Sequence, residues 1–163
     1  ASHRLPLRRA TAYSRPQSDV NTLNFAFIGC GGVTLQNHLP GLARCLDVKL
    51  VALCDADAVT LERARLQTGV AVASTNFEDI VKRDDVHAVI IATPNFTHKP
   101  IALAAIAQGK HALCENPLAL NHADAKAMAA AAERAGASLL ADAPHDVQRP
   151  AAQVDPGLVR RKV

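Results

Sequence analysis

The sequence predicts a doubly wound α/β domain, in which a parallel sheet is covered by helices on both faces. Strand-like and helix-like segments alternate along residues 23–141. The strand-like segments are apolar throughout, which is typical of strands that are buried on both faces. Apolar residues make up 49% of the chain and aromatic residues only 3%. The core is therefore expected to consist of small and branched aliphatic side chains.

The first strands and helix of this pattern lie within residues 23–55. LNFAFIG (23–29) is a predicted strand, and the glycine-rich turn after it opens a helix. Pro40 lacks a backbone N–H and is expected to bend this helix or divide it into two pieces. KLVALCD (49–55) is a second buried strand. The residues expected on the core side of the helix are Leu35, Leu39, Leu42, Ala43 and Leu46.

A helix, a short strand and a short helix follow. VTLERARLQTG (59–69) is a predicted helix that Gly69 ends, because glycine readily adopts the left-handed conformation found there. VAVAS (70–74) is a short strand, and NFEDIVKR (76–83) is a short helix. The residues of the longer helix expected to face the core are Leu61, Ala64 and Leu66.

The last segments complete the alternation. HAVIIAT (87–93) is a strand, KPIALAAIAQG (99–109) a helix with proline in its first turn, and KHALCE (110–115) another strand. Asn121 is an N-cap for a long alanine-rich helix running to Gly136, and SLLAD (138–142) is the final strand. The predicted strand order is 3-2-1-4-5-6.

The ends of the chain differ from this pattern. We expect residues 1–22 to be a disordered extension, residues 23–141 to form the domain, and residues 142–163 to be an unstructured tail. The first 22 residues hold four arginines and one aspartate, which accounts for the whole net charge of +3. The neutral remainder, with few aromatic residues to stack on bases, argues against nucleic-acid binding.

Cysteine spacing and hydropathy indicate the cellular compartment of the protein. The four cysteines stand at positions 30, 45, 54 and 114 without a CxxC pair, so they predict apolar filler residues in a reducing compartment. They predict neither a metal site nor a disulfide framework. No apolar run approaches the length of a membrane span, and we expect a soluble, cytoplasmic protein without a membrane partner.

The glycine-rich stretch after the first strand is the main functional signal. Gly29, Gly31 and Gly32 follow a strand and open a helix, as the dinucleotide-binding fingerprint requires. The first glycine permits a tight turn, the second permits close approach of a pyrophosphate, and the helix N-terminus offers N–H groups to the anion. Thr34 takes the third small position, where the fingerprint usually has glycine.

An acidic residue supports the same interpretation. Asp55 ends the second strand, 26 residues after Gly29, where a carboxylate accepts hydrogen bonds from the adenine-ribose hydroxyls. A carboxylate repels the 2′-phosphate of NADP, and no arginine follows directly, so we expect NAD in preference to NADP. S-adenosylmethionine enzymes also combine a glycine loop with an acid. The strand ends Thr93-Pro94-Asn95 and Glu115-Asn116-Pro117 instead favour a dinucleotide.

Several segments together resemble the Gfo/Idh/MocA family, named for glucose–fructose oxidoreductase and inositol dehydrogenase. They are FAFIGCGGV, HLPGL, CDAD, ATPNFTHKPIALAAIAQGKHALCE and PLAL, in unbroken order within residues 23–141. The resemblance implies an N-terminal dinucleotide-binding domain and NAD(P)-dependent oxidation of CH–OH groups. It implies sugars, inositols and their derivatives as typical substrates.

The resemblance also implies roles for single residues. It places the glycines and Val33 on the pyrophosphate, Asp55 on the ribose, and Glu115 near the nicotinamide ribose. The residues that it implies along the cofactor are Thr93, Pro94, Asn95 and His98.

Two departures from the family pattern limit the expected activity. The family has lysine beside the reacting carbon where this chain has Asn116, and an amide cannot titrate near neutral pH. The family places its substrate pocket in a C-terminal α/β domain, where this chain becomes unpatterned. We therefore expect a truncated cofactor-binding domain with little or no turnover alone. The alternatives are a non-catalytic module that acts with a partner chain supplying a substrate domain, and a degenerate fragment.

Overall fold

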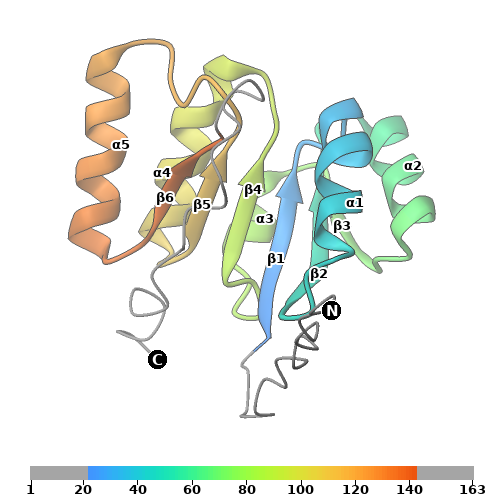
Figure 1. Ribbon diagram of the computed structural model, residues 1–163. Coiled ribbons are helices and arrows are strands. Elements are labelled where there is room, and N and C mark those ends of the chain that lie inside the picture. The colour runs from blue at the N-terminus through green and yellow to red at the C-terminus, as the bar shows by residue number, and fades with distance from the viewer. Residues whose placement is uncertain (1–21, 143–163) are drawn as a thin grey trace, which may run out of the picture.

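The computed structural model describes residues 22–142, and the expected extension and tail lie almost wholly outside them. These residues form a six-stranded parallel sheet in the order β3-β2-β1-β4-β5-β6, which confirms the predicted topology. Figure 1 shows the strands side by side between two layers of helices. The strands are β1 (Leu23–Ile28), β2 (Val48–Cys54), β3 (Val72–Ser74), β4 (Ala88–Ile91), β5 (His111–Cys114) and β6 (Leu139–Ala141).

The helices lie between the strands along the chain. They are η1 (Thr34–His38), α1 (Leu39–Leu42), α2 (Ala58–Thr68), α3 (Phe77–Val81), η2 (Asn95–Thr97), α4 (His98–Ala107) and α5 (His122–Ala135). Every predicted helix and strand is present. No helix within residues 22–142 is both long and apolar enough to cross a membrane.

Two apolar clusters fill the space between the sheet and its helices. One joins the sheet to α3, α4 and α5 and includes Ile80, Ile101 and Met128. The other joins the opposite face to η1, α1 and α2 and includes Phe27 and Leu61. The central strands β1, β2 and β4 are buried or partly buried by both clusters over most of their length, as their apolar sequences predicted. The edge strands β3 and β6 are partly exposed, and Leu140 on β6 is 58% exposed.

The helix after the glycine turn is wider than a regular α-helix near its middle. The segment η1 is a π-helix, and the N–H of Leu39 bonds to the carbonyl of Thr34, five residues back. Pro40 comes next, and its ring would clash with the carbonyl four residues before it in a regular helix. A π segment at this place accommodates the proline, so the helical run continues to Leu42 without dividing.

Three predicted core residues are wrong. Leu46 lies beyond the end of α1 and is 94% exposed, and Leu66 on α2 is 70% exposed. Ala43, also beyond α1, is exposed as well. The helix ends earlier than its apolar spacing suggested. On α2 the buried stripe is narrow, formed by Leu61 and Ala64.

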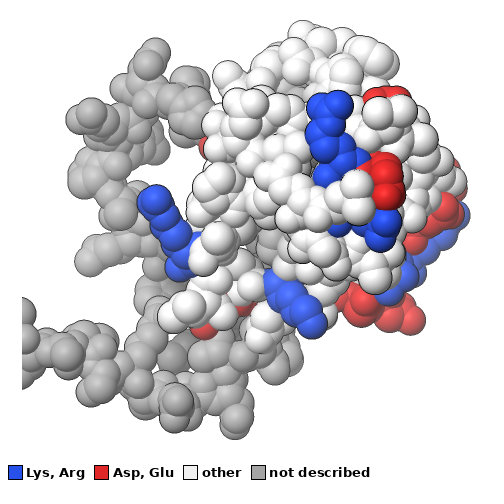
Figure 2. Space-filling view, turned by 90° about the vertical axis from the view of Figure 1, so that its right-hand side faces the viewer, with Lys and Arg blue, Asp and Glu red and all other residues white. Residues whose placement is uncertain are grey.

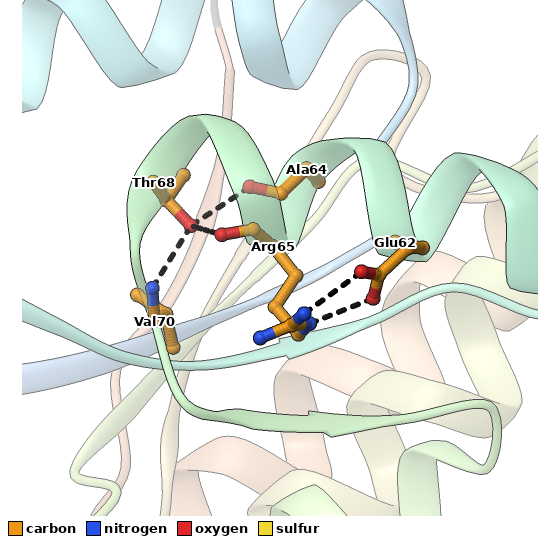
Figure 3. A network of polar contacts seen from close by, with 5 residues as sticks. All are labelled: Glu62, Ala64, Arg65, Thr68 and Val70. Carbon is orange, nitrogen blue, oxygen red and sulfur yellow. Dashed lines mark hydrogen bonds and ion pairs between the residues drawn. The ribbon is translucent and has the colours of Figure 1, made fainter.

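The end of α2 shows how a helix is closed before a strand (Figure 3). The hydroxyl of Thr68 donates to the carbonyl of Ala64 at 2.8 Å and accepts from the N–H of Val70 at 3.3 Å. Gly69 has a φ of 71° and ends the helix, as predicted. Arg65 pairs with Glu62 on the exposed side of the same helix. Figure 2 shows acidic and basic side chains beside one another on this side of the domain, among uncharged surface.

Candidate functional site

The carboxyl ends of the strands lie in register along one edge of the sheet. Ile28 is aligned with Cys54 on one side and with Ile91 on the other. The row continues to Cys114 and Ala141. The residues that follow these strands therefore meet at one edge, which is where ligands bind in open α/β sheets.

Gly29 forms the tight turn at the end of β1. Its φ is 96°, and a Cβ placed there would lie 2.4 Å from the carbonyl oxygen of Ala92. Its N–H donates to the carbonyl of Cys54 at 2.8 Å. Glycine is required at this position because the backbones of β1 and β4 approach each other closely. Gly29 thus shapes the edge through packing within the protein.

Gly31 and Gly32 differ from Gly29 because their surroundings are open. A Cβ at Gly31 would have no atom within 4 Å, and one at Gly32 would meet only Gln36 Nε2 at 3.8 Å. The carbonyl of Gly31 accepts from the N–H of Leu35 at 3.1 Å, so the helix begins here. Packing within residues 22–142 does not explain a glycine at position 31. A ligand resting on the loop would explain it.

Thr34 fills the third small position of the fingerprint. Its side chain is buried, and its hydroxyl donates to the carbonyl of Gly29 at 2.7 Å. This bond ties the start of the helix to the tight turn.

Asp55 connects the glycine loop to the next strand. One carboxylate oxygen accepts from the N–H of Cys30 at 2.7 Å, and the other accepts from the N–H of Asp57 at 2.9 Å. Each carboxylate oxygen can accept more than one hydrogen bond, so these bonds leave room for ribose hydroxyls. The carboxylate is half-buried and lies directly beside the loop.

Three of the four cysteines lie inside the domain as the sequence predicted. Burial raises the pKa of Cys30, Cys54 and Cys114 to about 12, with a smaller contribution from the charge of Asp55 at the first two. These thiols are therefore protonated and unreactive near neutral pH. Cys45 is exposed.

His98 does not lie where a residue in direct contact with the cofactor is expected. The side chain is fully buried, with Nε2 2.9 Å from the carbonyl oxygen of Thr93 and Nδ1 3.0 Å from that of Pro117. Both ring nitrogens are occupied by protein carbonyls. His98 holds the loop after β4 against the loop after β5, while Pro94 and Asn95 are exposed at the edge.

Val33, just before η1, is 45% exposed. The loop after β5 carries the last two predicted residues. Glu115 Oε1 is hydrogen-bonded to Nε2 of His38, a residue that was not predicted to lie at the site. Asn116 is exposed, and its side chain makes no hydrogen bond within the described residues. His38, Glu115 and Asp142 each offer a polar atom within 4.8 Å of the other two. Glu115 and Asp142 directly follow strands, and this position in the sequence could have indicated that they lie at the same edge of the sheet.

A separate depression of about 410 Å³ lies at the opposite edge of the sheet, near the starts of β2 and β3. Lys49, Thr68 and Asp85 line it together with neighbouring backbone. It is shallow and open, and it lies away from the edge where parallel sheets bind ligands. The glycine-loop edge is therefore the candidate site.

Comparisons with known proteins agree with this geometry. A family model for the oxidoreductase family with an NAD-binding Rossmann fold matches residues 23–142. An inositol 2-dehydrogenase from Ralstonia nicotianae is 38% identical over 121 residues, which cover 73% of this chain and 35% of the relative. The chain spans about a third of the length of the curated relatives it matches.

Solved structures of similar fold contain nicotinamide dinucleotides. The WlbA dehydrogenase from Bordetella pertussis, in complex with NADH and UDP-GlcNAcA, has a TM-score of 0.71 and 28% identity, covering 78% of this chain and 36% of its own. A variant of KijD10, a 3-ketoreductase from Actinomadura kijaniata in complex with NADP, has a TM-score of 0.70 and 25% identity, covering 75% and 37%.

Proposed function

Because this chain belongs to the Gfo/Idh/MocA family of oxidoreductases with an NAD-binding Rossmann fold, we propose that it binds NAD(H) along the carboxyl edge of its sheet. The pyrophosphate rests on Gly31, Gly32 and Val33, at the start of the helix. The observation that carries the proposal is the open space at Gly31, where a Cβ would have no atom within 4 Å.

The pyrophosphate position follows from the helix start. The first N–H groups of a helix have no carbonyl partner within the helix, and the aligned peptide dipoles place partial positive charge there. Gly31, with no side chain, lets an anion approach these groups. The hydroxyl of Thr34 is hydrogen-bonded to Gly29, and the carboxylate of Asp55 is hydrogen-bonded to Cys30. These bonds fix the conformation of the loop before the ligand binds.

The preference for NAD(H) over NADP(H) rests on Asp55. Its carboxylate accepts hydrogen bonds from the ribose hydroxyls of NAD but repels the 2′-phosphate of NADP. The next two residues, Ala56 and Asp57, supply no positive charge to offset this repulsion.

The nicotinamide end lies between the loops after β4 and β5 in this proposal. Thr93, Pro94 and Asn95 contact the cofactor, Glu115 lies near the nicotinamide ribose, and His98 positions both loops. The bound dinucleotide would supply hydride transfer to or from a sugar or inositol type of substrate. Asn116 can hydrogen-bond a substrate hydroxyl but cannot exchange a proton near neutral pH. We therefore expect weak or no polyol oxidation by this chain alone.

A titration with NADH and NADPH tests the cofactor proposal, followed by nicotinamide fluorescence and by the melting temperature. Saturable binding with NADH preferred is expected. At a ligand concentration 100 times Kd, binding stabilises a protein by about 2.7 kcal/mol, which should be visible as a rise of several degrees. Absence of binding by a folded sample overturns the proposal.

Two pairs of variants locate the binding site. Gly31→Val should weaken NADH binding by roughly tenfold or more, the equivalent of about 1.4 kcal/mol, without lowering the melting temperature. Gly41→Val is its control, because Gly41 also has open surroundings but lies on α1 away from the loop. Asp55→Asn should shift the preference toward NADPH, whereas the same change at Asp57 should not. Equal behaviour within either pair contradicts the assigned contacts.

A further inference from the structure

His38, Glu115 and Asp142 form a compact polar group at the edge of the sheet. One potential ligand atom from each lies within 4.8 Å of the other two. His38 ends η1, Glu115 follows β5 and Asp142 follows β6. All three side chains are half-buried, with exposed fractions of 16% for His38 and 20% for Glu115. The group is therefore held by three separate elements and remains accessible to small ions.

The charges within this group are unbalanced. Two carboxylates lie close together, and like charges at such distances repel. Among the ion pairs of residues 22–142, His38 is the partner of Glu115, and no lysine or arginine pairs with either carboxylate. The backbone N–H of Asp142 donates to Cys114, but its carboxylate accepts no hydrogen bond within that range. The neighbouring Asn116 is neutral. A cation would offset this charge.

The donor types narrow the choice of cation. One imidazole nitrogen and two carboxylate oxygens suit zinc and similar divalent metals, whereas Mg²⁺ and Ca²⁺ prefer oxygen ligands alone. Bonds of about 2.0–2.2 Å place zinc ligands roughly 3.4 Å apart in a tetrahedron. The separations of up to 4.8 Å require small side-chain movements. The metal ion would replace the hydrogen bond between His38 Nε2 and Glu115 Oε1, and its proton would be released to solvent. The thiol of Cys114 is fully buried in the core and does not belong to this group.

We propose that His38, Glu115 and Asp142 bind one divalent first-row transition metal ion, with Zn²⁺ as the representative ligand. Three protein ligands leave the remaining coordination position to water, as in open zinc sites. The bound ion would fasten the end of η1 to the ends of β5 and β6. Glu115 also lies near the nicotinamide ribose in the proposed function, so the metal titrations are made without dinucleotide.

Titration of the metal-free protein with Zn²⁺ tests this proposal, with heat of binding and the melting temperature as readouts. Co²⁺ provides a second probe, because its visible absorption reports the coordination geometry. Both titrations use the full chain carrying Cys45→Ser, since Cys45 is the exposed thiol and could bind zinc by itself. The expected result is one ion per chain, a higher melting temperature and a Co²⁺ spectrum characteristic of bound metal.

Single substitutions assign the ligands. The three variants to compare are His38→Gln, Glu115→Gln and Asp142→Asn. Each should lower the affinity for Zn²⁺ by more than about tenfold, which is the loss typical of removing a residue that only hydrogen-bonds to a metal ligand. His122→Gln and Asp84→Asn are matched controls at exposed positions and should bind as the parent does. The absence of binding by the parent overturns the proposal, as does unchanged affinity in folded ligand variants.

The cofactor titration distinguishes the two proposals. A chain that binds NADH but no Zn²⁺ refutes the metal site alone. A chain that binds Zn²⁺ but neither dinucleotide refutes the proposed function alone. If a ligand variant fails to fold, the Co²⁺ spectrum of the parent still tests the proposed ligands. Absorption bands that lack the signature of mixed nitrogen and oxygen coordination refute this set of ligands.

Discussion

Replacing Gly29 by alanine should destabilise the domain far more than the same change at other glycines. The new Cβ would lie 2.4 Å from the oxygen, 2.6 Å from the carbon of the Ala92 carbonyl and 2.9 Å from the N–H nitrogen of Thr93. These atoms belong to the backbone at the end of β4, and the N–H of Ala92 donates to Ile28 at 2.8 Å. These backbone atoms cannot move away from the new Cβ as the end of a flexible side chain could.

The expected loss has two parts. A residue with a side chain held at positive φ costs about 1–2 kcal/mol, and forcing an extra carbon into a packed region costs about 1–3 kcal/mol. Together they give about 2–5 kcal/mol, a large share of the roughly 5–15 kcal/mol that stabilises a typical domain. For a domain of this size, each kcal/mol lowers the melting temperature by about 4 °C, so a fall of roughly 8–20 °C is expected.

Urea unfolding and thermal melting, followed by circular dichroism, measure this loss. Gly109→Ala is the control, because Gly109 has a φ of 70° but a Cβ there would have no atom within 4 Å. Gly109→Ala should lose only the roughly 1–2 kcal/mol of stability that comes from holding a side chain at positive φ. If the two variants lose equal stability, the close approach between Gly29 and β4 is refuted. If Gly29→Ala melts like the parent, both parts of the reasoning fail.

Three further predictions concern other parts of the domain. His98→Leu removes the bridge between two loop carbonyls and should cost about 1–3 kcal/mol in urea unfolding, while weakening NADH binding; unchanged values of both would contradict its positioning role. Iodoacetamide should label Cys45 alone in the native protein, as judged by peptide mass spectrometry, because burial protects the other thiols. The hydrogen bond from Lys99 lowers the pKa of Asp124, so Lys99→Met should be less stable than the parent at neutral pH, and that difference should vanish as the pH falls through and below about 4.

The sequence was sufficient for the topology and most helix ends because each depends on local signals. Asn121 caps α5, as its side chain accepts from the N–H of Asp124, and Gly136 ends that helix with a φ of 64°. The parallel order follows from apolar strands separated by helices. The extent of burial on single helices was less predictable. Leu46 and Leu66 have apolar spacing but lie outside the contacts that the sheet makes.

The candidate site was predictable only in part. The fingerprint located the glycine loop and Asp55 because those residues are close in sequence to recognisable strand ends. It could not separate the role of Gly29, which is set by the approach of β4, from that of Gly31. His98 was predicted as a cofactor contact, yet its burial depends on the loop after β5. The pairing of His38 with Glu115 joins residues 77 positions apart, and no spacing rule reports such a contact.

The position of β1 in the middle of the sheet has a consequence during synthesis of the chain. Among the six strands of residues 22–142, β1 is made first, but its neighbour β4 ends at Ile91, 63 residues after Ile28. At translation rates of about 5–20 residues per second, β1 waits roughly 3–13 s for that neighbour. During this interval one side of Phe25 and Phe27 has no partner strand. We expect ribosome-bound chains that end before β4 to bind chaperones, and those that include β6 to be released from them.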